Sequence, residues 1–146
     1  MTTSAQVDPR GLRVSAALTS VVLAAALVTP RPVAIALLVV QGVIFALGAF
    51  VSLQASPSSL FFRRVVRPRL GAPAELEDAR PPRFAQLVGL VFAVAALAGY
   101  ALGAPTVGLV ATAFALVAAL LNAVVGLCLG CEMYLASRRL RLALAG

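Results

Sequence analysis

Long runs of apolar residues dominate the sequence, and short segments rich in proline, glycine and arginine separate them. Four such runs cover residues 12–29, 32–53, 84–103 and 106–135. A helix of about 20 apolar residues spans the ~30 Å hydrocarbon core of a bilayer. The pattern therefore predicts an all-α protein in which a four-helix transmembrane bundle forms a single domain over residues 1–146.

Proline and glycine mark the turns between these runs. Pro30 and Pro32 cannot continue a helix well, so they predict a tight turn between the first and second spans. Gly103-Ala104-Pro105 predicts a second tight turn before the fourth span. The fourth run stays apolar as far as the two cysteines, and we expect its helix to continue past them towards the basic residues near the carboxyl end.

The composition excludes a soluble globular domain. Hydrophobic residues make up 62% of the chain and charged residues only 12%. The mean hydropathy is +1.02, whereas a soluble domain of similar length needs polar residues along helix backs and loops. The lipid bilayer is therefore the expected surrounding of this chain.

The net charge of +7 comes from twelve arginines, no lysine and five acidic residues. The arginines lie at the edges of the apolar runs rather than along one solvated face, so we expect no nucleic-acid binding. Eleven of them lie in the amino-terminal segment, the 54–83 loop and the carboxyl-terminal segment, and Arg31 alone lies on the other side. Because arginine near a span resists translocation, both termini and the long loop are expected to face the cytoplasm.

The loop between the second and third spans contains an amphipathic segment. Apolar residues of the 58–67 stretch fall on one helical face and arginines on another, which predicts a short interfacial helix that ends near Pro68. The apolar face is expected in the headgroup boundary, and the arginines are expected to meet anionic lipid or a partner protein. The residues assigned to this membrane interface are Phe61, Phe62, Arg63, Arg64 and Arg67.

Two polar side chains fall within the spans, Gln41 in the second and Asn122 in the fourth. A polar group that faces lipid is costly, so both are expected to point inward. An interhelical hydrogen bond is the simpler interpretation, and a path for a small solute is the alternative. No charged residue lies near the middle of a span, which argues against a proton-coupled transporter.

Glycines spaced four residues apart mark helix faces that allow close backbone approach. The pairs are Gly99 with Gly103, and Gly126 with Gly130. Packing within the bundle is the favoured interpretation of both pairs. Contact between copies of the chain in a homo-oligomer is the alternative.

Cys128 and Cys131 are the only cysteines, and their spacing places both thiols on one face of a continuous helix. Such a pair suits redox chemistry, sulfur transfer or metal binding, although cysteine in an apolar helix is also an ordinary packing residue. A helix that starts at Thr106 rises ~33 Å over about 22 residues, which puts the pair at the cytosolic membrane boundary. The cytosol is reducing, so a free dithiol is expected. The carboxyl end of a helix disfavours the thiolate, whereas nearby arginines favour it.

Four short motifs are distributed along the chain, next to the ends of the predicted spans. Val7-Asp8-Pro9-Arg10 precedes the first span, Ser56-Pro57 follows the second, Arg83-Phe84-Ala85-Gln86 opens the third, and the cysteine motif of residues 126–134 closes the fourth. Together they resemble the bacterial domain of unknown function 4395 family over nearly the whole chain. The resemblance implies a small four-helix protein of the bacterial inner (plasma) membrane, common in actinobacteria and often associated with sulfurtransferase or thioredoxin-like proteins. It implies no established activity.

By looser analogy, the layout is similar to four-helix membrane thiol proteins of the vitamin K epoxide reductase and DoxX types. The former carry their cysteine pair on the outer face, and no residue of this sequence indicates quinone binding. Two cysteines without any histidine cannot complete a tetrahedral zinc site alone, so no metal or cofactor is expected.

These features lead to three functional hypotheses. The first is a membrane thiol protein that exchanges electrons or sulfur with a cytosolic thioredoxin-like or rhodanese-like partner. In this hypothesis Arg83 and Gln86 flank the thiols. The sequence leaves open which cysteine attacks, with Cys131 slightly favoured because it is nearer to water. The second is a non-catalytic scaffold that tethers a soluble partner through the 54–83 loop. The third is a small-solute carrier that uses Gln41 and Asn122.

Overall fold

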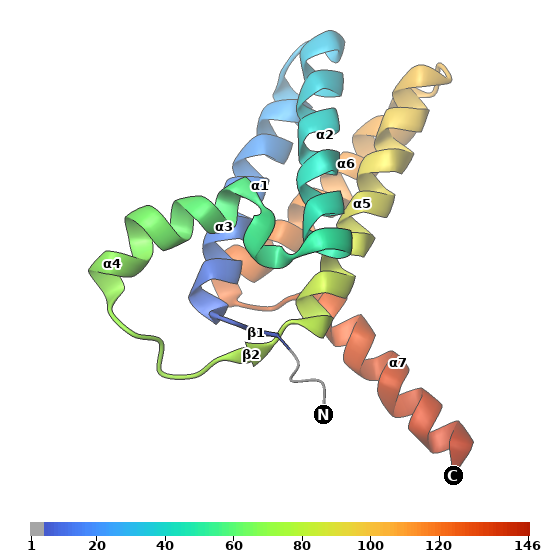
Figure 1. The fold of residues 1–146 in the computed structure, drawn as a ribbon. Coiled ribbons are helices and arrows are strands. Elements are labelled where there is room, and N and C mark those ends of the chain that lie inside the picture. Colours follow the sequence, from blue (N-terminus) through green and yellow to red (C-terminus); the bar gives the residue numbers. More distant parts are fainter. Residues whose placement is uncertain (1–4) are drawn as a thin grey trace.

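The computed structural model describes residues 5–146 and shows four long helices packed side by side (Figure 1). They are α1 (Pro9–Val28), α2 (Arg31–Ala46), α5 (Arg80–Ala101) and α6 (Pro105–Leu120). Short π-helical segments extend α2 through Val51 and α6 through Val125, so all four helices are long and apolar enough to cross a membrane. The predicted all-α fold with four spans is confirmed.

Shorter elements gather at the end of the bundle where both termini lie (Figure 1). Between the second and third spans, α3 (Pro57–Phe61), a π-helical segment (Phe62–Val66) and α4 (Arg67–Leu70) follow one another without a gap. The strands β1 (Gln6–Val7) and β2 (Glu77–Asp78) pair antiparallel and tie the amino-terminal segment to the loop before α5. After the fourth span, α7 (Leu129–Ala145) projects away from the bundle.

The helical stretch between the second and third spans differs from the prediction in two ways. It continues beyond Pro68 to Leu70, because proline is tolerated in the first turn of a new helical segment, and it ends at Gly71, whose φ is +72°. Phe62, expected in the headgroup boundary, is instead buried against α1, where its ring lies over Gly11. Phe61, in contrast, has 45% of its surface exposed.

The prediction of one continuous fourth helix over residues 106–135 is wrong. The helix ends at Val125, and Gly126 follows with a φ of +79°, a left-handed conformation that L side chains rarely adopt. Leu127 and Cys128 are not helical, and α7 begins only at Leu129. The cysteines therefore lie at the amino end of a separate helix, not at the carboxyl end of the fourth span.

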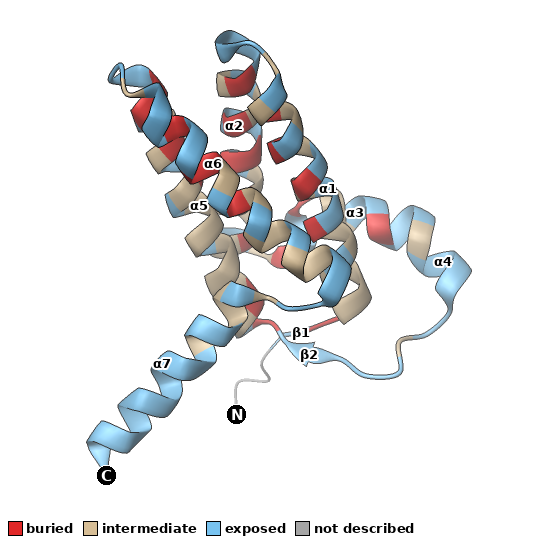
Figure 2. Ribbon diagram, turned by 180° about the vertical axis from the view of Figure 1, so that it is seen from behind, coloured by how far each residue is buried: buried red, intermediate tan, exposed pale blue. Residues whose placement is uncertain are grey.

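The best-packed part of the bundle lies at the end opposite the termini, where tight turns hold the helix pairs together. Figure 2 shows buried residues concentrated there, in the second halves of α1 and α5 and the first halves of α2 and α6. Small residues allow this close packing. The buried members of this main core are Leu23, Ala26, Ala34, Leu38, Ala96, Tyr100, Ala111 and Ala115. A smaller cluster of Val7, Leu53 and Ala79 lies at the terminal end.

In each predicted glycine pair, one glycine allows close packing and the other makes a turn. A Cβ on Gly99 would lie 2.7 Å from the backbone nitrogen of Gly108, and one on Gly130 would lie 2.6 Å from Ala85. Gly103 and Gly126 instead have positive φ values of 77° and 79°. Bundle packing is thus confirmed for one member of each pair.

Gln41 points inward as predicted. Its side chain is buried, and its Nε2 donates to Thr19 Oγ1 on α1 at 3.4 Å. The amide therefore forms the interhelical hydrogen bond that the sequence favoured over a solute path.

The close approach at Gly99 gives a test of the packing. Gly99→Ala is expected to destabilise the protein by about 1–3 kcal/mol, because the new methyl group would collide with backbone atoms at the start of α6. Gly42→Ala is the matched control, since its Cβ would meet only Ala93 at an ordinary 3.8 Å. In a helix interior, alanine is more favourable than glycine by up to ~1 kcal/mol. Thermal unfolding in detergent measures both. Equal loss of stability in the two variants would contradict the close approach.

Candidate functional site

The two cysteines form the start of α7. Cys128 has extended backbone angles (φ −89°, ψ 99°) and occupies the N-cap position, where its sulfur accepts a hydrogen bond from the backbone N–H of Cys131 at 3.3 Å. Its carbonyl oxygen accepts the N–H of Glu132 at 3.0 Å. A cysteine sulfur thus takes the role that serine, threonine or aspartate commonly fills at a helix start.

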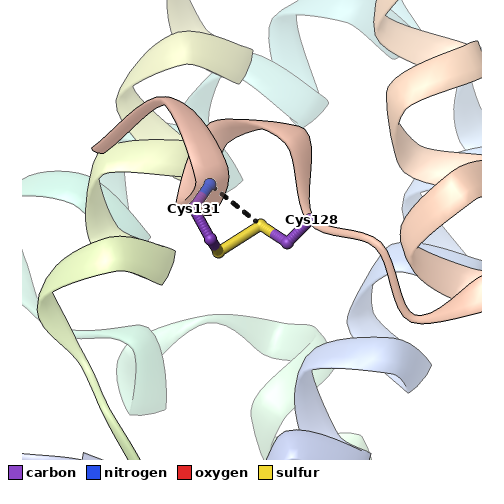
Figure 3. The surroundings of a disulfide bond; sticks show 2 residues. All are labelled: Cys128 and Cys131. Carbon is purple, nitrogen blue, oxygen red and sulfur yellow. Dashed lines mark hydrogen bonds between the residues drawn. A yellow bond between two sulfur atoms is a disulfide. The ribbon is translucent and has the colours of Figure 1, made fainter. Parts of the chain in front are cut away.

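A disulfide joins Cys128 and Cys131 (Figure 3). The structure therefore differs from the expected free dithiol on one face of a regular helix. The physical reason is the extended conformation of Cys128, which lies outside the helix. The pair is therefore released from the regular i, i+3 spacing, in which the Cβ atoms lie about 5–6 Å apart, whereas a disulfide requires roughly 3.5–4.5 Å.

The electrostatic setting of the pair is also the reverse of the expectation. The sequence placed the cysteines near the carboxyl end of a helix, where the dipole disfavours a thiolate. In the structure they lie at the amino end of α7, whose unpaired N–H groups and positive dipole end favour negative charge. Glu132 occupies the first turn of α7, where its carboxylate also benefits from the dipole.

Backbone contacts anchor the loop that carries the cysteines at both of its ends. The N–H groups of Gly126 and Leu127 donate to carbonyls of the last helical turn of the fourth span, at 3.1 and 3.2 Å. On the other side, Gly130 packs directly on Ala85 of α5. The turn that holds the disulfide is therefore fixed between the fourth span and the start of the third.

Arg13 is a further residue of this site that was not predicted to lie near the cysteines. Its guanidinium donates to the carbonyls of Ala123 and Val124, with a shortest distance of 2.8 Å, and so satisfies the last carbonyls of the fourth span. It also lines a cavity together with both cysteines. Its role was hidden because its partners are backbone groups, which no side-chain motif reveals.

The predicted flanking residues are separated in the structure. Gln86 lines the same cavity as the cysteines and packs on Gly48 of the second span. Arg83 does not line that cavity, and its guanidinium donates to the carbonyl of Ala49 at 3.0 and 3.2 Å. Arg83 therefore satisfies a backbone carbonyl at the end of the second span.

The cavity has a volume of about 640 Å³ and opens beside the disulfide. Side chains of α1, α2, α5 and α6 line it, together with the loop and first turns of α7. Asn122, assigned from sequence as an intramembrane polar residue, lies in its wall, whereas Gln41 does not. Among residues 5–146, no group of three or more histidine, cysteine, aspartate or glutamate side chains is placed to hold a metal ion.

A second cluster at the same end joins the amino-terminal motif to the helical stretch of residues 57–70. The Asp8 carboxylate caps α1 and binds the Arg10 guanidinium at 2.9 Å, and Arg10 also donates to the carbonyls of Leu70 and Gly71. The hydrogen bond from Arg10 lowers the pKa of Asp8 below its ordinary value of 3.8, and the positive charge of Arg67 adds to this effect. We refer to Asp8, Arg10, Leu70 and Gly71 as the amino-terminal clamp.

The other interface residues are exposed. They are Arg63, Arg64 and Arg67, on the helical stretch that the amino-terminal clamp holds. At the start of α7, Tyr134 packs on Phe84 of α5 with the ring centroids 5.7 Å apart. The terminal end of the bundle thus presents two arginine-bearing helical elements around the cysteine loop.

Comparison with known protein families gives a match. A family model described as Domain of unknown function (DUF4395) matches residues 7–139, from β1 into α7, and so includes both the amino-terminal clamp and the disulfide. The comparisons with curated proteins and with solved structures give no match.

The amino-terminal clamp predicts a specific pH dependence. Because the pKa of Asp8 is lower in the folded protein than in the unfolded chain, its charge stabilises the fold above pH 3.8, and this contribution is lost as the pH falls through the lowered value. Asp8→Asn keeps a helix-capping side chain but removes the charge, so it should lower the melting temperature at neutral pH and reduce the loss on acidification. Glu75→Gln, at an exposed loop position, is the control. Parallel acid-unfolding curves for wild type and Asp8→Asn would contradict the clamp.

Arg13 gives a second prediction. Arg13→Met leaves the carbonyls of Ala123 and Val124 without their donor, so the cysteine loop should loosen and a small thiol reductant should open the disulfide up to roughly tenfold faster. Arg31→Met is the matched control, because Arg31 donates to the carbonyl of Tyr100 at the opposite end of the bundle. Mass-resolved alkylation over time measures the rate. An unchanged rate in Arg13→Met would show that Arg13 does not hold this loop.

Proposed function

The chain belongs to the DUF4395 family, and from its cysteine site we propose that this member is a membrane thiol protein that exchanges electrons or sulfur with a soluble thioredoxin-like or rhodanese-like partner. The observation that carries this proposal is the position of Cys128. Its sulfur accepts the Cys131 N–H at the amino end of α7, in the setting that stabilises a thiolate when the disulfide opens.

Cys128 is the nucleophile in this proposal, in place of the Cys131 that the sequence favoured. The Cys128 thiolate attacks a partner disulfide, which forms a mixed disulfide and releases one partner thiolate. Cys131, deprotonated, then attacks the Cys128 sulfur, which forms the intramolecular disulfide and releases the second partner thiolate. Two electrons pass to the partner, and the two thiol protons of the pair pass through water to the partner's thiolates. The reverse sequence reduces the pair.

Sulfur transfer uses the same two residues. The Cys128 thiolate attacks the outer sulfur of a partner persulfide, which leaves the partner as a thiolate and Cys128 as a persulfide. Attack by the Cys131 thiolate on the Cys128 inner sulfur then forms the disulfide and releases hydrosulfide. Both routes end in the Cys128–Cys131 disulfide that the structure contains.

The arginine distribution supports a cytoplasmic location for this site. The amino-terminal segment, the 54–83 loop and α7 meet at one end of the bundle, and eleven of the twelve arginines belong to them. By the positive-inside rule this end faces the cytoplasm of a bacterial inner membrane. A disulfide there meets a reducing pool, which suits a pair that is opened and re-formed rather than a permanent brace.

The arginines around the site also suit a docking partner. Arg63, Arg64 and Arg67 on one side and Arg138, Arg139 and Arg141 on the other are exposed. Positive potential around a reactive site favours encounter with an acidic protein surface, and the effect weakens with salt.

A non-catalytic scaffold is the second candidate, because one specific contact favours it. Arg10 holds the end of the helical stretch of residues 57–70, so this arginine-bearing element is presented in a fixed position and could bind a partner or anionic lipid without thiol chemistry. The solute-carrier hypothesis gains no such support, since the Gln41 amide is bonded to Thr19.

Trapping separates the two candidates. Cys131→Ser is expected to capture the partner as a mixed disulfide on Cys128 in cell lysates quenched with acid, because no second thiol is present to release it. Cys128→Ser should capture much less, because Cys131 does not have the capping position. Non-reducing electrophoresis followed by mass spectrometry identifies the adduct, and Cys128→Ser/Cys131→Ser is the blank. Absence of an adduct from both single variants, together with a normal phenotype for the double variant, would favour the scaffold.

A further inference from the structure

The cavity beside the disulfide is larger than thiol exchange requires. Its volume of about 640 Å³ lies between α1, α2, α5 and α6, and it extends from the cysteine loop to Phe92 and Phe114 near the middle of their helices. Those two rings stack with centroids 6.4 Å apart at the end of the cavity remote from the cysteine loop, and 62% of the Phe114 surface is exposed. The main core fills the opposite half of the bundle, so the cavity occupies the half in which buried residues are few.

The position of the lining residues restricts what can enter. Leu12, Ala16, Phe45, Val88 and Ala118 belong to the four helices that are long and apolar enough to cross a membrane, so the cavity lies largely at bilayer depth. Binding pockets for small molecules commonly have volumes of about 300–1,000 Å³ and mostly apolar walls. An apolar cavity of this size at this depth suits a molecule that dissolves in the membrane.

The polar groups of the cavity indicate the chemistry of the bound molecule. Gln86 and Asn122 present neutral amides near the cysteine loop. Within the described range 5–146, neither amide forms a hydrogen bond with another residue, and neither is a buried group without a partner. Both amides are therefore accessible to a bound molecule. The lining also includes Arg13 and the carboxylates of Glu77, Asp78 and Glu132, of which Asp78 pairs with Arg80 at 3.8 Å. Within the lining, the two remaining carboxylates outnumber Arg13, which disfavours an anion inside the cavity despite the arginines on the outer surface. Free amides, in contrast, donate to and accept from an uncharged oxygen.

We propose that this cavity binds an uncharged, lipid-soluble alcohol or carbonyl compound. Its apolar body extends towards Phe92 and Phe114, and its polar end bonds to Gln86 or Asn122 beside the cysteine loop. The site goes beyond the thiol exchange proposed above and does not depend on it, because none of these contacts involves a sulfur reaction.

Photolabelling of the full chain tests the site. The probe is a diazirine derivative of farnesol, an uncharged prenyl alcohol, added to purified protein in lipid nanodiscs. We expect the label on cavity-facing residues of α5 and α6. Ala118→Phe, which fills the cavity, should reduce labelling by roughly tenfold, the change that a loss of 1.4 kcal/mol in binding produces. Val117→Phe, on the exposed face of the same helix, should leave labelling unchanged.

Competition gives an independent measurement on the unaltered protein, which keeps the test valid if Ala118→Phe does not fold. Excess unlabelled farnesol should abolish cavity labelling, whereas palmitate, which carries a carboxylate, should not compete. Label spread over lipid-facing residues such as Val117 and insensitive to farnesol would overturn the proposal. Equal competition by palmitate would overturn the assignment of an uncharged polar end.

Discussion

Backbone carbonyls at interrupted helix ends are the constraint on which this fold depends. Each end leaves carbonyl groups without an intrahelical partner, and at the border of a membrane these groups need donors from elsewhere in the chain. Arginine supplies them repeatedly: Arg10 at the end of α4, Arg13 at the end of the fourth span, Arg83 at the end of the second and Arg31 at the end of α5. Arginine side chains thus join the helices to one another.

The cysteine site is a consequence of one of these interruptions. Gly126 ends the fourth span in a left-handed conformation, Arg13 satisfies the carbonyls that the ending leaves, and Cys128 begins a new helix with its sulfur as the cap. Dense packing of small residues at the opposite end leaves the cysteine end open, so a cavity and a disulfide lie side by side. In a continuous helix the same two cysteines would lie at a helix carboxyl end, on a regular turn and without a cap.

The spans could be predicted because bilayer thickness dictates the length of an apolar run, and the turns at Pro30 and Gly103 carry strong local signals. The break at Gly126 could not, because apolar residues continue on both sides and a thiol is a rare helix cap. The burial of Phe62 depends on a tertiary contact with Gly11, which no local pattern reveals. The roles of Arg10 and Arg13 escaped prediction for a similar reason, since each binds backbone carbonyls remote in sequence.

We propose that the interruption at Gly126 creates a helix start that activates Cys128. The most direct measurement is the rate at which iodoacetamide alkylates each cysteine of the reduced, purified protein at neutral pH, resolved by peptide mass spectrometry. We predict that Cys128 reacts faster than Cys131, and that Gly126→Leu, which disfavours the left-handed ending, removes the difference. Equal rates in the unaltered protein, or faster alkylation of Cys131, would contradict the claim.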